Sequence, residues 1–345
     1  FFFTHKTAYE IPLRLVGSEM CIRDRIVSFA LIFSSSAFAN TIGVVYDSGG
    51  KFDKSFNELS FKTAQRVVDE LGWSMIEFES SNDAQIEQGM RKVADRGATM
   101  IVAMGFAMAD AIGAVAADYP DIKFVATDIC WLDDVNNNMY QSCYKEHEGS
   151  FLVGMLAAMK SESGTIGFVG GMDIPLIRKF QGGYEQGAQY VNPDIEVIAN
   201  MTGTTGEAWN NPTKGAELTK AQIDGGADVV YHAAGATGIG VLQAAADAGI
   251  LGIGVDDNQN YLHPGSVLTS MVKRLDLTIF EQAQAVENGT FESGIYILGL
   301  AEDMVGFTVD EHNSSLVSSD MISSVEAAKA GIVDGSIAVA DWSQE

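Results

Sequence analysis

The chain has 345 residues, of which 47% are hydrophobic, and its 46 acidic against 21 basic residues give a formal net charge of −25. This length is sufficient for two domains of ordinary size, and the composition is that of a globular protein. The acidic charge argues against nucleic acids and anionic membrane surfaces as partners. No apolar run in the sequence reaches the roughly 18–20 residues of a transmembrane helix.

The first 39 residues are expected to lie outside the mature protein. The stretch VGSEMCIRDR resembles a translated sequencing adapter, so we interpret residues 1–25 as an assembly artefact. The apolar run IVSFALIF, the arginines before it and the A-F-A motif after it are typical of a signal peptide. We therefore interpret residues 26–39 as a signal-peptide remnant cleaved after Ala39, and expect a periplasmic protein. Because position 40 is Asn and not Cys, we expect no lipid anchor.

Strand-like and helical segments alternate along the rest of the chain. A strand over 41–46 is followed by a polar loop and by a helix over 55–71, whose apolar residues recur at helical spacing. Further strands are predicted at 75–78, 100–104, 123–127, 165–169, 197–199, 229–233, 252–255 and 267–271. Near-continuous apolar strands separated by helices predict an α/β fold, with parallel sheets covered by helices on both faces.

An internal repeat divides this pattern into two halves. The sequence T-I-G-V-V at residue 41 returns as T-I-G-F-V at residue 165, and each copy is followed by a Gly- and Asp-containing loop and a helix. Two half-chains with the same opening predict two similar, doubly wound lobes.

The loop after the first strand combines small polar groups with aromatic ones. Its candidate ligand-binding residues are Asp47, Phe52, Asp53, Ser55 and Asn57. A strand that delivers a polar loop to a helix start builds a binding crevice in open α/β sheets, because the free N–H groups of the helix face the cleft. Ser55 and Glu58 also have the spacing of a capping box. An ordinary turn is the alternative, although two aromatics (Phe52 and Phe56) beside three small polar groups (Asp53, Ser55 and Asn57) exceed what a turn requires.

Other predicted loops add candidate groups. Gly105 would let the backbone approach a ligand closely, next to Phe106, and Gly235 lies in a similar small-residue loop. Asp128 follows a strand, where a helix cap or turn is the alternative role. Trp209 precedes Asn-Asn-Pro in a loop that reads as exposed, which favours ligand stacking over core packing.

Asp256 and Lys273 are suited to holding a sugar. A carboxylate accepts hydrogen bonds from both hydroxyls of a vicinal diol, and an ammonium group donates to their lone pairs. A solvated lysine at a helix start is the alternative for Lys273. The predicted cleft loops lack the arginines that phosphate or carboxylate ligands require, which argues against nucleotides and amino acids.

These motifs together resemble the basic membrane protein family, the substrate-binding proteins of ABC importers. The similar stretches are D-S-G-G-K-F-D-K-S-F-N from Asp47, A-T-D ending at Asp128, G-V-D-D-N-Q ending at Gln259 and T-S-M-V-K ending at Lys273. They occur in the family's order over residues 41 to about 340. One departure is Asn258, where the family has a second Asp.

The resemblance implies the type I periplasmic binding protein fold, in which the chain crosses three times between two hinged lobes that close on the ligand. Carried over, lobe 1 comprises 40–146 plus 266–291, and lobe 2 comprises 147–265 plus 292–345.

The resemblance also implies a ligand and residue roles. Several members of the family bind purine nucleosides, with aromatics at the positions of Phe52 and Trp209 stacked on the base. Many relatives have Phe where this chain has Trp209. Asp128 is implied as a ligand-binding carboxylate, and Asp256 and Lys273 as the residues that hold the ribose.

We therefore expect a binding protein that captures a purine nucleoside and delivers it to an inner-membrane ABC permease. The expected partners include no nucleic acid, and the expected oligomeric state is a monomer. The sequence has no G-x-S-x-G, H-E-x-x-H or P-loop motif and no Cys/His set with metal spacing, so neither catalysis nor a cofactor is expected. A sugar or another small polar ligand is the first alternative. A nucleoside-hydrolysing enzyme that uses Asp256 and Asp257 is the second, and a receptor that presents the ligand to a signalling partner is a third.

Cys130 and Cys143 are 13 positions apart around a predicted loop. The oxidising compartment favours a disulfide between them, and two free thiols are the alternative.

Overall fold

The computed structural model describes residues 39–80 and 82–344. The predicted artefact over 1–25 and the predicted signal peptide up to residue 38 lie outside the described residues. No helix in the described part combines the length and the apolar character needed to cross a membrane.

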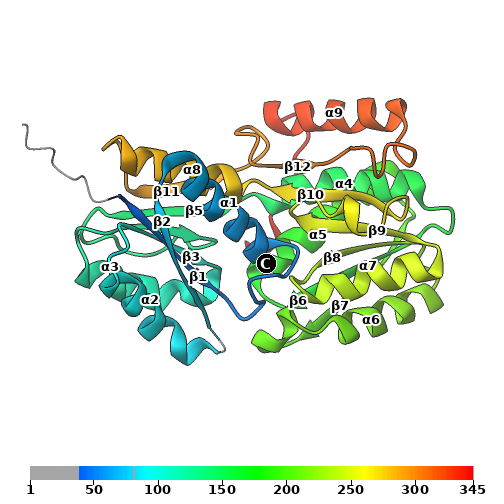
Figure 1. Cartoon of the computed structure of the whole chain (residues 1–345). Helices are drawn as coiled ribbons and strands as arrows, with labels where there is room; N and C mark the ends of the chain where they lie inside the picture. The colour runs from blue at the N-terminus through cyan, green and yellow to red at the C-terminus, as the bar shows by residue number, and fades with distance from the viewer. Residues whose placement is uncertain (1–38, 81, 345) are drawn as a thin grey trace, which may run out of the picture. The chain divides into compact units, whose positions relative to one another are not determined.

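Two six-stranded sheets organise the described chain (Figure 1). The strands of the first sheet are β1 (Thr41–Tyr46), β2 (Ser74–Glu79), β3 (Met100–Met104), β4 (Lys123–Thr127), β5 (Met139–Tyr144) and β11 (Gly294–Leu298). Those of the second are β6 (Thr165–Met172), β7 (Glu196–Gly203), β8 (Val229–Ala233), β9 (Leu251–Asp256), β10 (Val267–Lys273) and β12 (Val305–Phe307). Their orders are β11-β5-β4-β3-β1-β2 and β12-β10-β9-β8-β6-β7. The strand pairs are parallel except β10 with β12, which is antiparallel.

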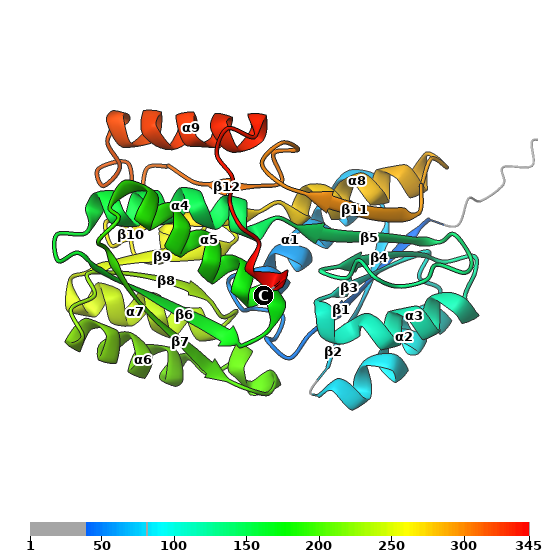
Figure 2. The same ribbon diagram turned by 180° about the vertical axis from the view of Figure 1, so that it is seen from behind.

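Helices cover both faces of each sheet, as the near-continuous apolar strands predict. The first sheet packs against α1 (Phe56–Leu71), α2 (Ile86–Asp95), α3 (Ala109–Asp118) and α8 (Leu275–Glu287), with α1 and α8 together on one face. The second packs against α4 (Glu146–Lys160), α5 (Pro175–Val191), α6 (Pro212–Asp224) and α7 (Thr237–Ala248), and α9 (Ser319–Asp334) packs on α4. The fold is thus α/β with two doubly wound lobes, which confirms the predicted class. In the view from behind, the C-terminal turn η5 (Trp342–Gln344) lies against α5 (Figure 2).

Burial explains why the strands read as apolar runs. Ile42 and Val44 in β1 and Phe168 in β6 are fully buried, and they belong to one core that extends through both lobes. A second cluster lies between the first sheet and the helices α2 and α3. Each fully buried aliphatic or aromatic side chain contributes roughly 1.5–3 kcal/mol, so these clusters stabilise the platform that holds the strand ends.

The chain crosses between the sheets three times: after β5, after β10 and after β11. The expected boundaries differ from this at two strands. Residues 266–291 are expected in lobe 1, but β10 pairs with β9 and β12 in the second sheet. Residues 292–345 are expected in lobe 2, but β11 pairs with β5 in the first. A buried parallel strand has the same apolar pattern in either sheet, so only the pairing reveals where it belongs.

We therefore propose a division that follows the sheets. Lobe 1 consists of β1 to β5 with α1 to α3, followed by α8 and β11. Lobe 2 consists of β6 to β10 with α4 to α7, followed by β12 and α9.

A disulfide joins Cys130 to Cys143, with 5.9 Å between their Cα atoms. Cys130 follows β4 and Cys143 lies in β5, so the bridge closes the loop between these neighbouring strands.

Candidate functional site

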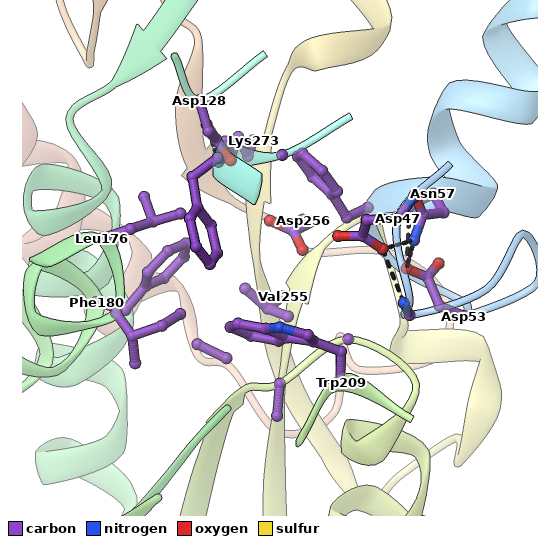
Figure 3. A pocket seen from close by; sticks show the side chains of 18 residues that line it. Asp47, Asp53, Asn57, Asp128, Leu176, Phe180, Trp209, Val255, Asp256 and Lys273 are labelled. Atoms are coloured by element: carbon purple, nitrogen blue, oxygen red, sulfur yellow. Dashed lines mark hydrogen bonds and ion pairs between the residues drawn. The ribbon is translucent and has the colours of Figure 1, made fainter. Parts of the chain in front are cut away.

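A cavity lies between the two lobes at the carboxyl ends of the strands, with about 550 Å³ of empty space including its open mouth (Figure 3). Ten of the twelve predicted ligand-binding residues line it: Asp47, Asp53, Asn57, Gly105, Phe106, Asp128, Trp209, Gly235, Asp256 and Lys273. They converge because the carboxyl ends of parallel strands meet at one edge of each sheet.

Phe52, which is predicted to stack on the ligand, is not among the residues that line the cavity. Its side chain is 63% exposed and meets the ring of Phe61 edge-on, with 5.7 Å between the ring centroids. Lys54 adopts a left-handed conformation with φ of 60°, and Phe56, not Phe52, lines the cavity. The direction of this tight turn could not be read from residue types alone.

Ser55 is also not among the lining residues, but it supports one of them. Its hydroxyl donates to the carboxylate of Asp256 at 2.7 Å and lies 3.2 Å from the carbonyl oxygen of Val255. Ser55 belongs to lobe 1 and Asp256 to lobe 2, so this contact joins the lobes beside the cavity.

The predicted capping box at the start of α1 does not form, and Asp53 caps this helix in its place. Ser55 makes no side-chain hydrogen bond to the helix backbone. The Asp53 carboxylate accepts from the backbone N–H groups of Ser55, Asn57 and Glu58 at 2.9, 3.0 and 3.0 Å. Burial raises the pKa of Asp53 to about 7, although these three hydrogen bonds oppose the shift.

Asn57 connects two carboxylates at the cavity wall. Its Nδ2 donates to Asp47 Oδ1 at 2.7 Å and to Asp53 Oδ2 at 3.2 Å (Figure 3). The same oxygen of Asp47 accepts from the backbone N–H of Gly49 at 2.8 Å. The three side chains thus form a fixed polar edge on the lobe 1 side.

Three strand ends turn into the cavity through left-handed backbone. Asp128 after β4 has φ of 63°, and Asp256 at the end of β9 has φ of 64°. Asp tolerates this region better than most residues because its short side chain can hydrogen-bond locally. Gly105 after β3 has φ of 98°, which a side chain rarely allows. This shared geometry redirects the chain at the point where each strand delivers its polar group.

Lys273 is the centre of a buried charge cluster. Its Nζ lies 2.7 Å from the Asp128 carboxylate and 3.0 Å from Glu146 Oε1, and its side chain is 1% exposed. Burial alone would lower the pKa of Lys273, but Asp128, Glu146 and Asp256 raise it above its ordinary value. Burial raises the pKa of Asp128 to about 6, against the opposing effect of Lys273. The Lys273–Asp128 pair joins the lobes, since β10 belongs to lobe 2 and β4 to lobe 1.

Aromatic rings form the other walls. The rings of Trp209 and Phe106 lie 6.5 Å apart at an interplanar angle of 66°. Gly171 permits the position of Trp209, because a Cβ atom there would lie 2.1 Å from the indole ring. Phe56 and Phe180 lie under Lys273, with Nζ at 5.2 and 5.8 Å from their ring centroids.

The sequence prediction missed several contributors from outside the loops. Leu176, Ile177 and Phe180 line the cavity from α5, and Glu146 begins α4 behind Lys273. Residues on a helix carry no local signal for a site that depends on the approach of another lobe. For Phe56 a signal existed, because it lies inside the motif already noted.

The cavity suits a neutral ligand that has a flat face and hydrogen-bond donors. Four aspartates line it against one lysine, and no arginine does. Such a wall disfavours phosphate or carboxylate ligands. Within residues 39–80 and 82–344, no group of three or more His, Cys, Asp or Glu side chains is arranged to hold a metal ion.

Comparison with known proteins places this geometry in context. Basic membrane protein A2 of Borrelia garinii subsp. bavariensis is 31% identical over 293 residues, which is 83% of this chain and 84% of that protein. The CD4+ T-cell-stimulating antigen of Listeria monocytogenes is 29% identical over 324 residues, which is 87% of each.

Solved structures give the same picture. The solute-binding protein of an ABC transporter system from Aeropyrum pernix K1 has a TM-score of 0.79 and 26% identity, covering 88% of this chain and 93% of that one. The lac repressor dimer bound to operator has a TM-score of 0.54 at 16% identity, covering 81% of this chain and 82% of that one. This second likeness reflects the type I periplasmic binding protein fold alone.

The sequence matches the family described as "ABC transporter substrate-binding protein PnrA-like" (Bmp) over residues 40–341, nearly the whole described chain. The chain therefore belongs to this family of basic membrane proteins, the substrate-binding components of ABC transporters.

Proposed function

We propose that this protein captures a purine nucleoside in the periplasm and delivers it to an inner-membrane ABC permease, acting as a monomer. A substrate-binding protein of this family binds its solute outside the cytoplasm without transforming it. The nucleoside and the compartment are the parts that we propose.

The observation that carries the proposal is that aromatic walls, Asp256 and Lys273 all line one cavity between the lobes. Trp209 and Phe106 provide the faces on which a planar base can stack. Asp256 and Lys273 line the same cavity and are suited to accept from and donate to the two ribose hydroxyls. Asp47 supplies a carboxylate acceptor for the edge of the base, and Asn57 holds that carboxylate in place.

Binding would require a local rearrangement of the rings. Trp209 and Phe106 meet edge-to-face, with ring centroids 6.5 Å apart and planes inclined by 66°. A base that enters between them displaces this contact and lies flat on one ring, while the other turns.

The test is isothermal titration of the refolded, ligand-free mature chain with guanosine, inosine, adenosine, cytidine and ribose. Refolding removes any ligand that copurifies. We expect micromolar or tighter binding of purine nucleosides and no heat from ribose. If no nucleoside gives a heat of binding, the purine nucleoside assignment is wrong. A heat of binding from ribose would indicate instead that the ligand is a sugar.

Two phenylalanine variants give a matched comparison. Phe106→Ala removes a cavity ring and should weaken binding by roughly 1–3 kcal/mol, the usual range for base stacking. Phe52→Ala removes an exposed ring outside the cavity and should leave the affinity unchanged. Equal losses in both variants would contradict the placement of the base.

A further inference from the structure

Gln259 forms a buried polar link between the two lobes. It follows β9 in lobe 2, and its side chain has no exposed surface. Its Nε2 donates to the carbonyl oxygen of Lys54 in lobe 1 at 2.8 Å. Its Oε1 accepts from the backbone N–H of Val255 at 2.9 Å and lies 2.9 Å from Nε2 of His232.

Its two backbone partners fix the orientation of the amide. The N–H of Val255 can only donate, and the carbonyl of Lys54 can only accept, so Oε1 must face the first and Nε2 the second. His232 must then donate from Nε2 to the same oxygen. Burial lowers the pKa of His232 to about 4, so the ring is neutral near pH 7 and its single proton lies on Nε2.

The carbonyl that Gln259 holds belongs to the residue next to Ser55. Ser55 donates to the carboxylate of Asp256 at 2.7 Å, and Asp256 lines the cavity. Lys54 has a left-handed backbone, so its carbonyl direction depends on a specific turn. Gln259 therefore fixes the Lys54–Ser55 peptide, and this peptide orients Ser55 toward Asp256, the carboxylate that we expect to hold the sugar.

We propose that Gln259 is a positioning residue that stabilises the closed arrangement of the lobes and thereby strengthens ligand binding, with His232 holding its amide in the productive orientation. This inference rests on the proposed function, because it assigns a role in capturing the ligand of that cavity. Gln259 is not a lining residue of the cavity, so it acts through Lys54, Ser55 and Val255.

A second contact between the lobes provides the matched control. Asp257 lies two positions before Gln259, and its Oδ2 lies 2.8 Å from Nζ of Lys62 in α1. The Lys62 side chain is 45% exposed, and exposed ion pairs contribute little because water and salt screen them. Removing this pair breaks a contact between the lobes without disturbing the buried amide.

The experiment compares Gln259→Glu with Asp257→Asn. The glutamate has the same shape and, in its ionised form, still accepts from Val255 and His232 but has no proton to donate to the carbonyl of Lys54. Because burial raises the pKa of a carboxyl group, the affinities are compared at about pH 9. Gln259→Glu should weaken guanosine binding about tenfold or more, as expected for a buried carbonyl facing an oxygen. Asp257→Asn should change it by less than about threefold. Unchanged affinity in Gln259→Glu, or equal losses in both variants, would overturn the proposal.

Two readouts separate this proposal from the nucleoside assignment. Labels at Gln88→Cys and Lys220→Cys, exposed on α2 in lobe 1 and α6 in lobe 2, report the distance between the lobes by electron-spin measurements. In ligand-free protein, Gln259→Glu should shift this distance distribution toward longer values than the wild type. Identical distributions would refute the role of Gln259 even if no nucleoside binds.

The His232 ring reports on the amide itself by NMR. The new carboxylate in Gln259→Glu should raise the pKa of His232 above that of the wild type, whereas Asp257→Asn should not. An unchanged His232 pKa would mean that the two side chains do not interact as inferred. If Gln259→Glu does not fold, Gln259→Met removes the same donor without a charge, and unchanged affinity in that variant would equally refute the role.

Discussion

Replacing Lys273 by methionine should destabilise the ligand-free protein more than any loss of packing would explain. Methionine has a similar length and can occupy the same volume, so the change removes mainly the charge. The side chain is 1% exposed, and its Nζ lies 2.7 Å from Asp128 and 3.0 Å from Glu146. Without it, two buried carboxylates lose their nearest counter-charge.

The magnitude follows from these distances. With an effective dielectric constant of about 20, unit charges at 2.7 and 3.0 Å attract by roughly 6 kcal/mol per pair. Most of this offsets the desolvation of the three groups in the intact protein. Removing one partner of a buried pair leaves that penalty uncompensated, which typically costs about 3–5 kcal/mol. Glu146 retains Lys179 at 3.5 Å, so the loss should be nearer to the lower end of this range.

The assay is urea unfolding of ligand-free wild type, Lys273→Met, and Lys273→Met combined with Asp128→Asn. The double variant should recover a clear part of the lost free energy of unfolding, because it no longer buries the unpaired Asp128 carboxylate. Lys62→Met removes ion pairs of a half-exposed lysine and should cost under about 1 kcal/mol. If Lys273→Met is as stable as the wild type, or if the double variant is no better than the single one, Lys273 does not stabilise the buried carboxylates in the way that its distances imply.

Four further variants test the site and its supports. Trp209→Ala should weaken purine nucleoside binding by roughly 1–3 kcal/mol in calorimetry, and an unchanged affinity would remove the stacking role. Asp256→Asn should weaken nucleosides more than free bases, and equal losses would contradict a ribose contact. Because the pKa of His232 is lowered to about 4, the unfolded state binds more protons than the folded state between about pH 6.5 and 4, and the free energy of unfolding falls by roughly 3 kcal/mol as pH falls through this window. His232→Gln should flatten this part of the curve of unfolding free energy against pH. An unchanged slope would show that His232 does not titrate as inferred. Mass spectrometry without reductant should find Cys130 bonded to Cys143, and two free thiols would contradict the bridge. Replacing both cysteines by serine should lower the free energy of unfolding by about 3 kcal/mol, the value for a loop of this size.

The architecture could be predicted where burial imposes a simple pattern. Strands such as β1 and β3 are apolar over most of their length because both faces are covered, and the sequence displays this directly. The strand β5 was missed because it carries Gln141 and Ser142 among its buried residues. Gln141 exchanges hydrogen bonds with the backbone of Leu132, which satisfies its amide without any apolar signature.

The residues of the candidate site that lie at strand ends could be predicted from the sequence, whereas those on α5 could not. Asp128, Asp256 and Lys273 each follow or end a recognisable strand, and parallel topology brings these ends together. Phe180 lies on a helix of the other lobe, so its approach depends on packing that no local pattern encodes. Residue types alone do not show that Phe56, and not Phe52, lines the cavity, because this depends on the left-handed turn at Lys54.

The order of the strands in the first sheet has a consequence for biosynthesis. Lobe 1 begins with β1, the first strand of the described chain, but ends with β11, which pairs with β5 and stacks Tyr296 on Tyr140 with ring centroids 4.1 Å apart. As the polypeptide emerges from a ribosome or a translocon, the edge of β5 stays uncovered until β11 (Gly294–Leu298) has appeared, about 150 positions after β5. An open strand edge is a template for incorrect pairing. The N-terminal lobe therefore matures late, and a chain truncated after α7 would leave both lobes unfinished, not one lobe intact.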